Sequence, residues 1–192
     1  MPRRFSFRPP LTLKGRKFLG LRGFSGKPFH PPLTDVPIGA YVLAAAGDTL
    51  SWVWSDASWA QEMFHAVTWV LVGGAIVGAF ASLTGIMDWW RSTSKGTQAR
   101  RTANAHAVTM IAMSALVSVN IMTRRGMWDD PATSTLSLGL SLAIALVMFV
   151  GAAIGGSLVF DYGFNVKTAG DSPAWHESEI DLMPGQKPSP SG

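Results

Sequence analysis

Two histidines beside long apolar stretches are the residues of this chain best suited to redox chemistry. His30 stands just before the first apolar stretch and His106 lies near the start of the third. Two neutral imidazoles from facing helices can supply both axial ligands of a b-type haem. In the competing, structural interpretation each ring only hydrogen-bonds a carboxylate or a main-chain carbonyl. A quinone headgroup could use the same residues, so haem b and quinone are both candidate cofactors.

Further polar side chains are expected in one layer with these histidines, because up-down topology brings the corresponding ends of all four apolar stretches to one side of a bundle. Ionisable residues within membrane segments face the protein interior or a cavity and commonly mark function. Pro31, Pro32 and Pro37 predict a broken helical start around Asp35. The candidate cofactor-binding residues are His30, Asp35, Asp88, Trp89, His106 and Tyr162.

Other chemistry has less support in the sequence. Asp48 and His65 predict a second, weaker site at the opposite side of the bundle. Asp35, Asp48 and Asp88 together allow a small proton-coupled transporter, although none lies at the bilayer midplane and no discontinuous helix pair is predicted. The chain has no cysteine, which excludes disulfides, thiolate metal sites and cysteine nucleophiles.

The elements that must position these residues are four apolar stretches, at residues 33–54, 64–88, 103–122 and 136–160. About 20 apolar residues suffice for a helix to cross the hydrocarbon of a bilayer. The chain is 47% hydrophobic and only 15% charged, as expected for a membrane protein. We therefore expect an all-α, four-helix membrane bundle at residues 30–166, between a basic arm (1–29) and an acidic, flexible tail (167–192).

Small residues recur at helical spacing on the second and fourth stretches. Such strips allow two membrane helices to approach closely. The predicted packing residues are Gly74, Gly78, Ala81, Gly85, Gly151 and Gly155.

Positive charge predicts the orientation. The positive-inside bias assigns the arm and the loop between the second and third stretches to the cytoplasm, so both termini are cytoplasmic and the protein lies in the inner membrane. Because topology explains these cations, nucleic-acid binding is not indicated. The loop carries Arg91, Lys95, Arg100 and Arg101, whereas Arg124 and Arg125 are offset by Asp129 and Asp130 on the other side. The arm residues expected to contact membrane lipids or a partner include Arg3, Arg4, Arg8, Arg16, Lys17 and Arg22.

Motifs on all four stretches give a family resemblance. They are residues 26–40, Leu83-Thr84-Gly85 with Asp88-Trp89, Asn104-Ala105-His106, and Gly155-Gly156-Ser157-Leu158-Val159-Phe160. In these segments, over residues 26–166, the chain resembles the bacterial membrane family called domain of unknown function 2231. The resemblance implies a four-helix membrane bundle. Some relatives are fused to a Rieske iron–sulfur domain, which implies electron transfer near quinones. Many members have a histidine where this chain has Ser157.

Three classes of function follow. The leading interpretation is an accessory subunit of a larger membrane complex, with a respiratory or redox complex as the candidate and no catalytic activity of its own. The arm and the tail would then dock to partners. The alternatives are an electron-transfer protein that binds haem or quinone, and the proton-coupled transporter.

Overall fold

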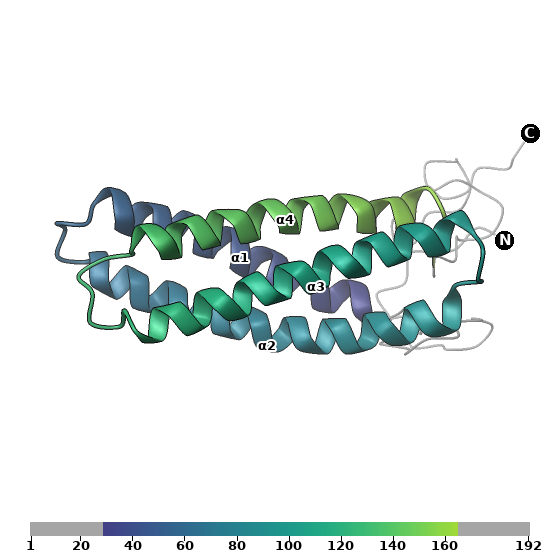
Figure 1. The fold of residues 1–192 in the computed structure, drawn as a ribbon, viewed down its shortest axis with the longest axis horizontal. Helices are drawn as coiled ribbons and strands as arrows, with labels where there is room; N and C mark the ends of the chain where they lie inside the picture. Colours follow the sequence, from purple (N-terminus) through teal and green to yellow (C-terminus); the bar gives the residue numbers. More distant parts are fainter. Residues whose placement is uncertain (1–28, 165–192) are drawn as a thin grey trace, which may run out of the picture.

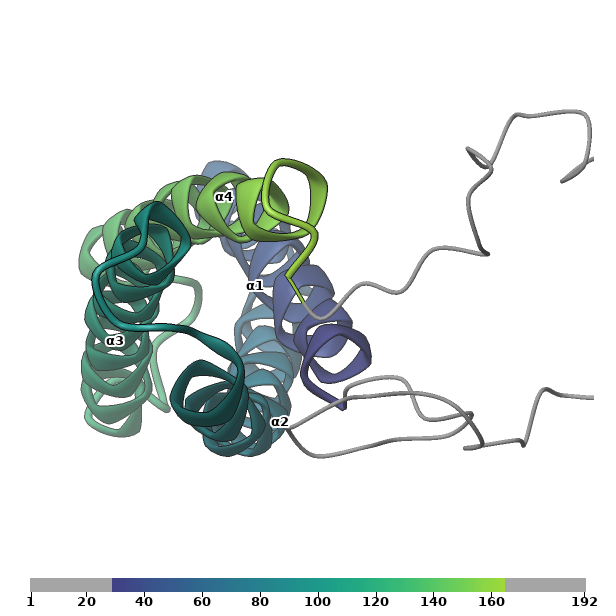
Figure 2. The same cartoon turned by 90° about the vertical axis from the view of Figure 1, so that its right-hand side faces the viewer.

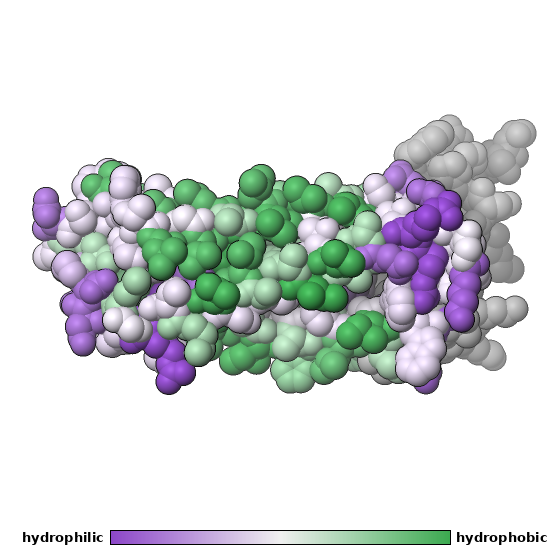
Figure 3. All heavy atoms as spheres, in the orientation of Figure 1, coloured by the Kyte–Doolittle hydropathy of each residue, from purple (hydrophilic) through white to green (hydrophobic). Residues whose placement is uncertain are grey.

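The computed structural model describes residues 29–164, apart from the side chain of Ser92, and within them the chain forms four helices in up-down order. These are α1 (His30–Val53), α2 (Ala60–Ser92), α3 (Gln98–Arg125) and α4 (Thr135–Phe160), drawn in Figure 1. All four are long and apolar enough to cross a membrane. Figure 3 shows mostly apolar residues over the middle of the face in view and hydrophilic residues toward both ends. The predicted all-α, four-span fold is confirmed, whereas the arm and the tail lie outside the described residues.

Helix α1 begins earlier and more regularly than predicted. It is helical from His30 and runs through Pro37 without a break, so the predicted broken start is wrong. Pro31 and Pro32 lie in the first turn, where their missing N–H groups would have no helical partner in any case. Pro37 loses one hydrogen bond within the helix, but its ring is buried in the bundle, close to Gly78 of α2.

The other helices also extend beyond the apolar stretches. Thr97 caps α3 by accepting a hydrogen bond from the Arg100 backbone N–H, and Ser134 caps α4 in the same way from Ser137. Such caps satisfy backbone donors that the first turn leaves without partners. Polar residues can therefore belong to a membrane helix where it emerges from hydrocarbon, so hydropathy alone underestimates its length.

The four helices form a square bundle, seen end-on in Figure 2. Helix α1 packs on α2 and α4, and α3 packs on the same two neighbours, so α1 and α3 lie on a diagonal. The buried apolar core includes Tyr41, Leu71, Val117, Ile144 and Met148. Close packing of α1 on α2 depends on Gly74, since a Cβ atom there would lie 2.8 Å from the Cβ of Ala40.

Candidate functional site

Two histidine rings meet across the diagonal of the bundle. His30 belongs to the first turn of α1, and His106 lies about two turns into α3. Their ring centres are 6.4 Å apart and their planes are nearly perpendicular, at 80°. The structure therefore brings together the two residues that the sequence singled out for redox chemistry.

Each ring is held by a main-chain carbonyl of the neighbouring helix. His30 Nδ1 lies 2.8 Å from the carbonyl oxygen of Ala81 on α2, and His106 Nδ1 lies 2.9 Å from that of Gly151 on α4. A carbonyl can only accept, so Nδ1 of each neutral ring carries the proton and Nε2 retains a lone pair. Metal-ligating histidines typically make this second hydrogen bond, which fixes the tautomer and the ring orientation.

Glycine provides the space for both rings. A Cβ atom at Gly85 would lie 2.8 Å from Cε1 of His30, and one at Gly155 would lie 3.0 Å from Cε1 of His106. Each glycine follows the carbonyl acceptor by one helical turn. The predicted packing strips of α2 and α4 therefore also accommodate the histidines.

The same arrangement occurs in both halves of the bundle. The α1–α2 hairpin and the α3–α4 hairpin each supply a histidine, a carbonyl acceptor on the second helix and a glycine one turn later. The interval between His30 and His106 is 76 residues, as is that between Asp48 and Arg124. The two histidines thus occupy equivalent positions in a repeated helical hairpin.

The distance between the two ring centres is compatible with two imidazoles that share one metal ion. With metal–nitrogen bonds of about 2 Å and roughly 1 Å from each nitrogen to its ring centre, two imidazoles on opposite sides of one metal have centres about 6 Å apart. The observed 6.4 Å agrees with this spacing. Within residues 29–164 no group of three or more histidine and carboxylate residues is placed to hold a metal ion.

The other predicted cofactor residues are divided between the interior and the surface. Asp88 is buried on α2, three residues after Gly85, and is 3% exposed. The Trp89 indole N–H donates to Asn104 Oδ1 over 2.7 Å. Asp35 is exposed, and Tyr162, which follows the end of α4, is 40% exposed. The structure therefore does not place Asp35 and Tyr162 in the buried layer.

At the other end of the bundle a buried ion pair replaces the predicted association of Asp48 with His65. Asp48 of α1 pairs with Arg124 of α3, and both side chains are fully buried. His65 instead stacks on Trp128, with ring centres 4.0 Å apart, and its Nε2 lies 2.8 Å from the Trp128 carbonyl oxygen. The prediction was wrong because it counted Arg124 as a loop charge, whereas α3 continues far enough to turn this residue inward.

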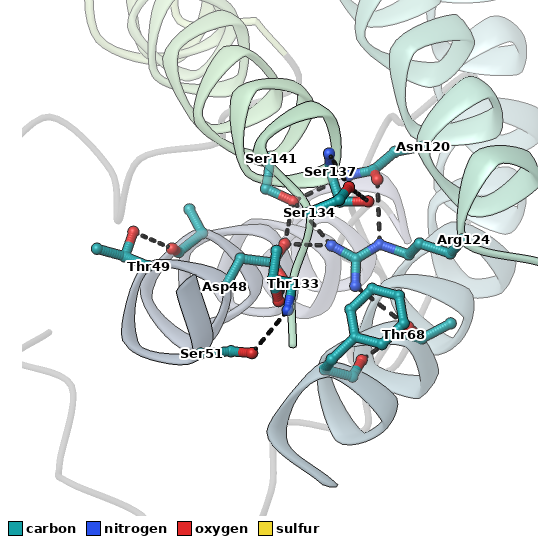
Figure 4. Close-up of polar contacts among 12 residues, drawn as sticks. Asp48, Thr49, Ser51, Thr68, Asn120, Arg124, Thr133, Ser134, Ser137 and Ser141 are labelled. Atoms are coloured by element: carbon teal, nitrogen blue, oxygen red, sulfur yellow. Dashed lines mark hydrogen bonds and ion pairs between the residues drawn. The ribbon is translucent and has the colours of Figure 1, made fainter. Parts of the chain in front are cut away.

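The Asp48–Arg124 pair is embedded in a hydrogen-bonded network that joins all four helices (Figure 4). Arg124 donates to Asn120 Oδ1 over 3.0 Å and to Thr68 Oγ1 over 3.1 Å. Asp48 accepts from the hydroxyls of Thr133 and Ser141. Sequence reasoning missed this network, although Asn120 and Arg124 lie one turn apart on the face of α3 that carries Val117. With its charges paired and hydrogen-bonded, the network is suited to structure rather than to chemistry.

The fold, with its four membrane-spanning helices, defines a multi-pass membrane protein. The chain belongs to the family described as "Predicted membrane protein (DUF2231)", whose profile matches residues 26–168. This match confirms the resemblance seen in the sequence. No curated protein and no solved structure matches the chain.

Proposed function

We propose that this protein is a membrane cytochrome that binds one b-type haem through His30 and His106. The observation that carries the proposal is the pair of imidazoles 6.4 Å apart, each with Nδ1 engaged by a carbonyl. Bound in this way, the haem would supply one-electron transfer. The haem class was an alternative in the sequence interpretation, and the geometry now favours it.

The residues around the pair have distinct roles in this proposal. His30 and His106 would hold the iron through Nε2. The carbonyls of Ala81 and Gly151 orient the rings and increase the basicity of the ligating nitrogens. Gly85 and Gly155 leave room for the two rings.

The oxidised form of a quinone fits these histidines less well. Its carbonyl oxygens need hydrogen-bond donors, but a neutral imidazole with Nδ1–H already engaged presents only an acceptor at Nε2. A purely structural subunit would not require two imidazoles fixed in matching tautomers at equivalent positions. A cytochrome can nevertheless be one subunit of a larger redox complex, and we retain that assembly as its setting.

The charge distribution supports a location in the inner membrane with the histidines near the cytoplasmic side. Arg91, Lys95, Arg100 and Arg101 lie at the same end of the bundle as His30. Their excess over acidic residues there follows the positive-inside bias.

The proposal is tested by the dithionite-reduced minus air-oxidised visible spectrum of the full chain, purified in mild detergent and supplied with haem. We expect the spectrum of a low-spin, bis-histidine haem, lost in His30→Ala and in His106→Ala. His65→Ala is the matched control, since His65 lies at the opposite end, and it should retain the spectrum. A wild-type chain that binds no haem, or binding that survives both substitutions, would overturn the proposal.

A further inference from the structure

An open pocket lies where α2 ends and α3 begins. These two helix ends are on the right in Figure 1. Its volume is about 540 Å³. It is lined by Trp89, Trp90, Thr93, Lys95 and Arg100. Two cations and two indole rings thus surround one cavity, which is separate from both the histidine pair and the Asp48–Arg124 network.

Arg100 is held in place by contacts that use only some of its N–H donors. Its guanidinium carbon lies 3.5 Å from the centre of the Trp89 ring, and its Nη1 donates to the Trp89 carbonyl oxygen and to Thr93 Oγ1. An arginine has five N–H donors. Among residues 29–164 no acceptor contacts Nε or Nη2 of Arg100, or the ammonium group of Lys95.

The surroundings of the pocket add positive charge. No acidic residue lies between Arg91 and Arg101 in the sequence, and the first turn of α3 contains none. The ion pair formed within the part of the chain that the structure describes joins Asp48 to Arg124, at the end of the bundle opposite the pocket. Neither Lys95 nor Arg100 therefore has a carboxylate partner there, and the pocket is suited to an anion.

The position of the pocket points to a membrane lipid as the source of that anion. Trp90 lines the pocket and is 72% exposed on a membrane-spanning helix near its end. Indole rings favour the boundary between hydrocarbon and headgroups, and cations attract anionic lipids at that depth. A soluble anion would gain nothing from the exposed indole.

We propose that this pocket binds the phosphate of an anionic phospholipid. Lys95 and Arg100 contact the phosphate, and Trp90 packs against the glycerol and the upper acyl chain. The proposal does not rest on haem binding, because Lys95, Arg100 and Trp90 take no part in the histidine pair.

The test is native mass spectrometry of the full chain in detergent, titrated separately with phosphatidylglycerol and phosphatidylcholine. We expect preferential retention of phosphatidylglycerol, with the apparent affinity lowered roughly fivefold by Lys95→Gln and by Arg100→Gln. Arg125→Gln removes an exposed cation from the other end of α3 and should leave retention unchanged. Since Lys95 is an exposed loop residue, its substitution should also leave the fold intact.

Four results would overturn the proposal. The first is equal retention of the two lipids by the wild-type chain, and the second is an equal loss in Arg125→Gln. The third is displacement of phosphatidylglycerol by millimolar inorganic phosphate, which would assign the pocket to a free anion. If lipid retention stays normal in Lys95→Gln and Arg100→Gln while the haem spectrum shifts, the cations serve the haem carboxylates, and the lipid proposal fails there as well.

Discussion

His30 and His106 each have one nitrogen committed to a main-chain carbonyl, and this distinguishes them from polar side chains that merely share a layer. In both cases the carbonyl belongs to the next helix in the sequence, α2 for His30 and α4 for His106. The geometry therefore fixes the chemical form of the rings as well as their position, since only Nε2 retains a lone pair.

At the residue scale, the glycines beside the rings give the sharpest prediction. Gly85→Ala would place a methyl group 2.8 Å from His30 Cε1, so the ring must shift, and haem affinity should fall by about tenfold or more. The measurement is the haem-to-protein ratio after purification, alongside the thermal unfolding midpoint.

Gly73→Ala is the matched control on the same helix, because a Cβ atom there meets nothing within 4 Å. Its haem content should equal that of the wild-type chain. Normal haem content in Gly85→Ala would mean that the contact with His30 does not govern ligand binding.

The sequence identified the histidines, but it could not identify what orients them. Their residue type and their places near helix ends were sufficient to select them as a pair. Their acceptors are main-chain carbonyls of Ala81 and Gly151, and a carbonyl acceptor leaves no signature in residue type. Arg124 was misjudged for a different reason, because a cation near a predicted helix end resembles a topology signal until the helix is known to continue.

At the scale of elements, the Asp48–Arg124 network links the four helices through hydrogen bonds at the end of the bundle opposite the histidine pair. Asp48→Leu would leave Arg124 buried without its counter-charge. We expect the free energy of unfolding to fall by about 3–5 kcal/mol. Thermal or denaturant unfolding in detergent, followed by circular dichroism, measures the change.

The double variant Asp48→Leu with Arg124→Leu should recover much of that loss, because it removes both buried charges. Asp56→Asn changes an exposed carboxylate in the neighbouring loop and should have little effect. Strictly additive losses in the double variant would show that the two side chains contribute separately rather than as a pair.

The number and type of the elements could be predicted because length and hydropathy in a membrane leave few alternatives. The ends of the helices could not, because they depend on local backbone bonding. Pro31 and Pro32 were interpreted as helix breakers, yet in a first turn they break no hydrogen bond.

At the scale of the whole molecule, the up-down order places the ends of the described chain, Phe29 and Phe164, on the side of the α2–α3 loop. The positive-inside bias predicts that this side is cytoplasmic. The chain has no cysteine, so single cysteines can report the orientation without background.

Ser55→Cys, in the α1–α2 loop, should react with a membrane-impermeant maleimide in cells whose inner membrane is intact. Ser94→Cys, in the α2–α3 loop, should react only after that membrane is permeabilised. Both positions are exposed, so a difference in labelling reflects the side of the membrane. The reverse pattern would invert the assigned orientation.

The basic arm leads to a separate prediction about assembly. Deletion of residues 2–26 removes cations that lie outside the described residues, together with the predicted docking element. We expect the shortened chain to remain inserted and to keep its haem but to co-purify with fewer partners. Unchanged co-purification would show that the chain does not need the arm to bind its partners.

The position of the histidine pair along the bundle has a consequence for energy conversion. His30 lies in the first turn of α1, so the proposed redox centre is close to one membrane surface and far from the other. Moving one elementary charge across a membrane potential of 100 mV involves about 2.3 kcal/mol. An electron that enters and leaves near the same surface crosses little of that potential. With this haem as its one redox centre, the protein would therefore transfer electrons without moving charge across the membrane. The rate of that transfer would be nearly insensitive to the membrane potential.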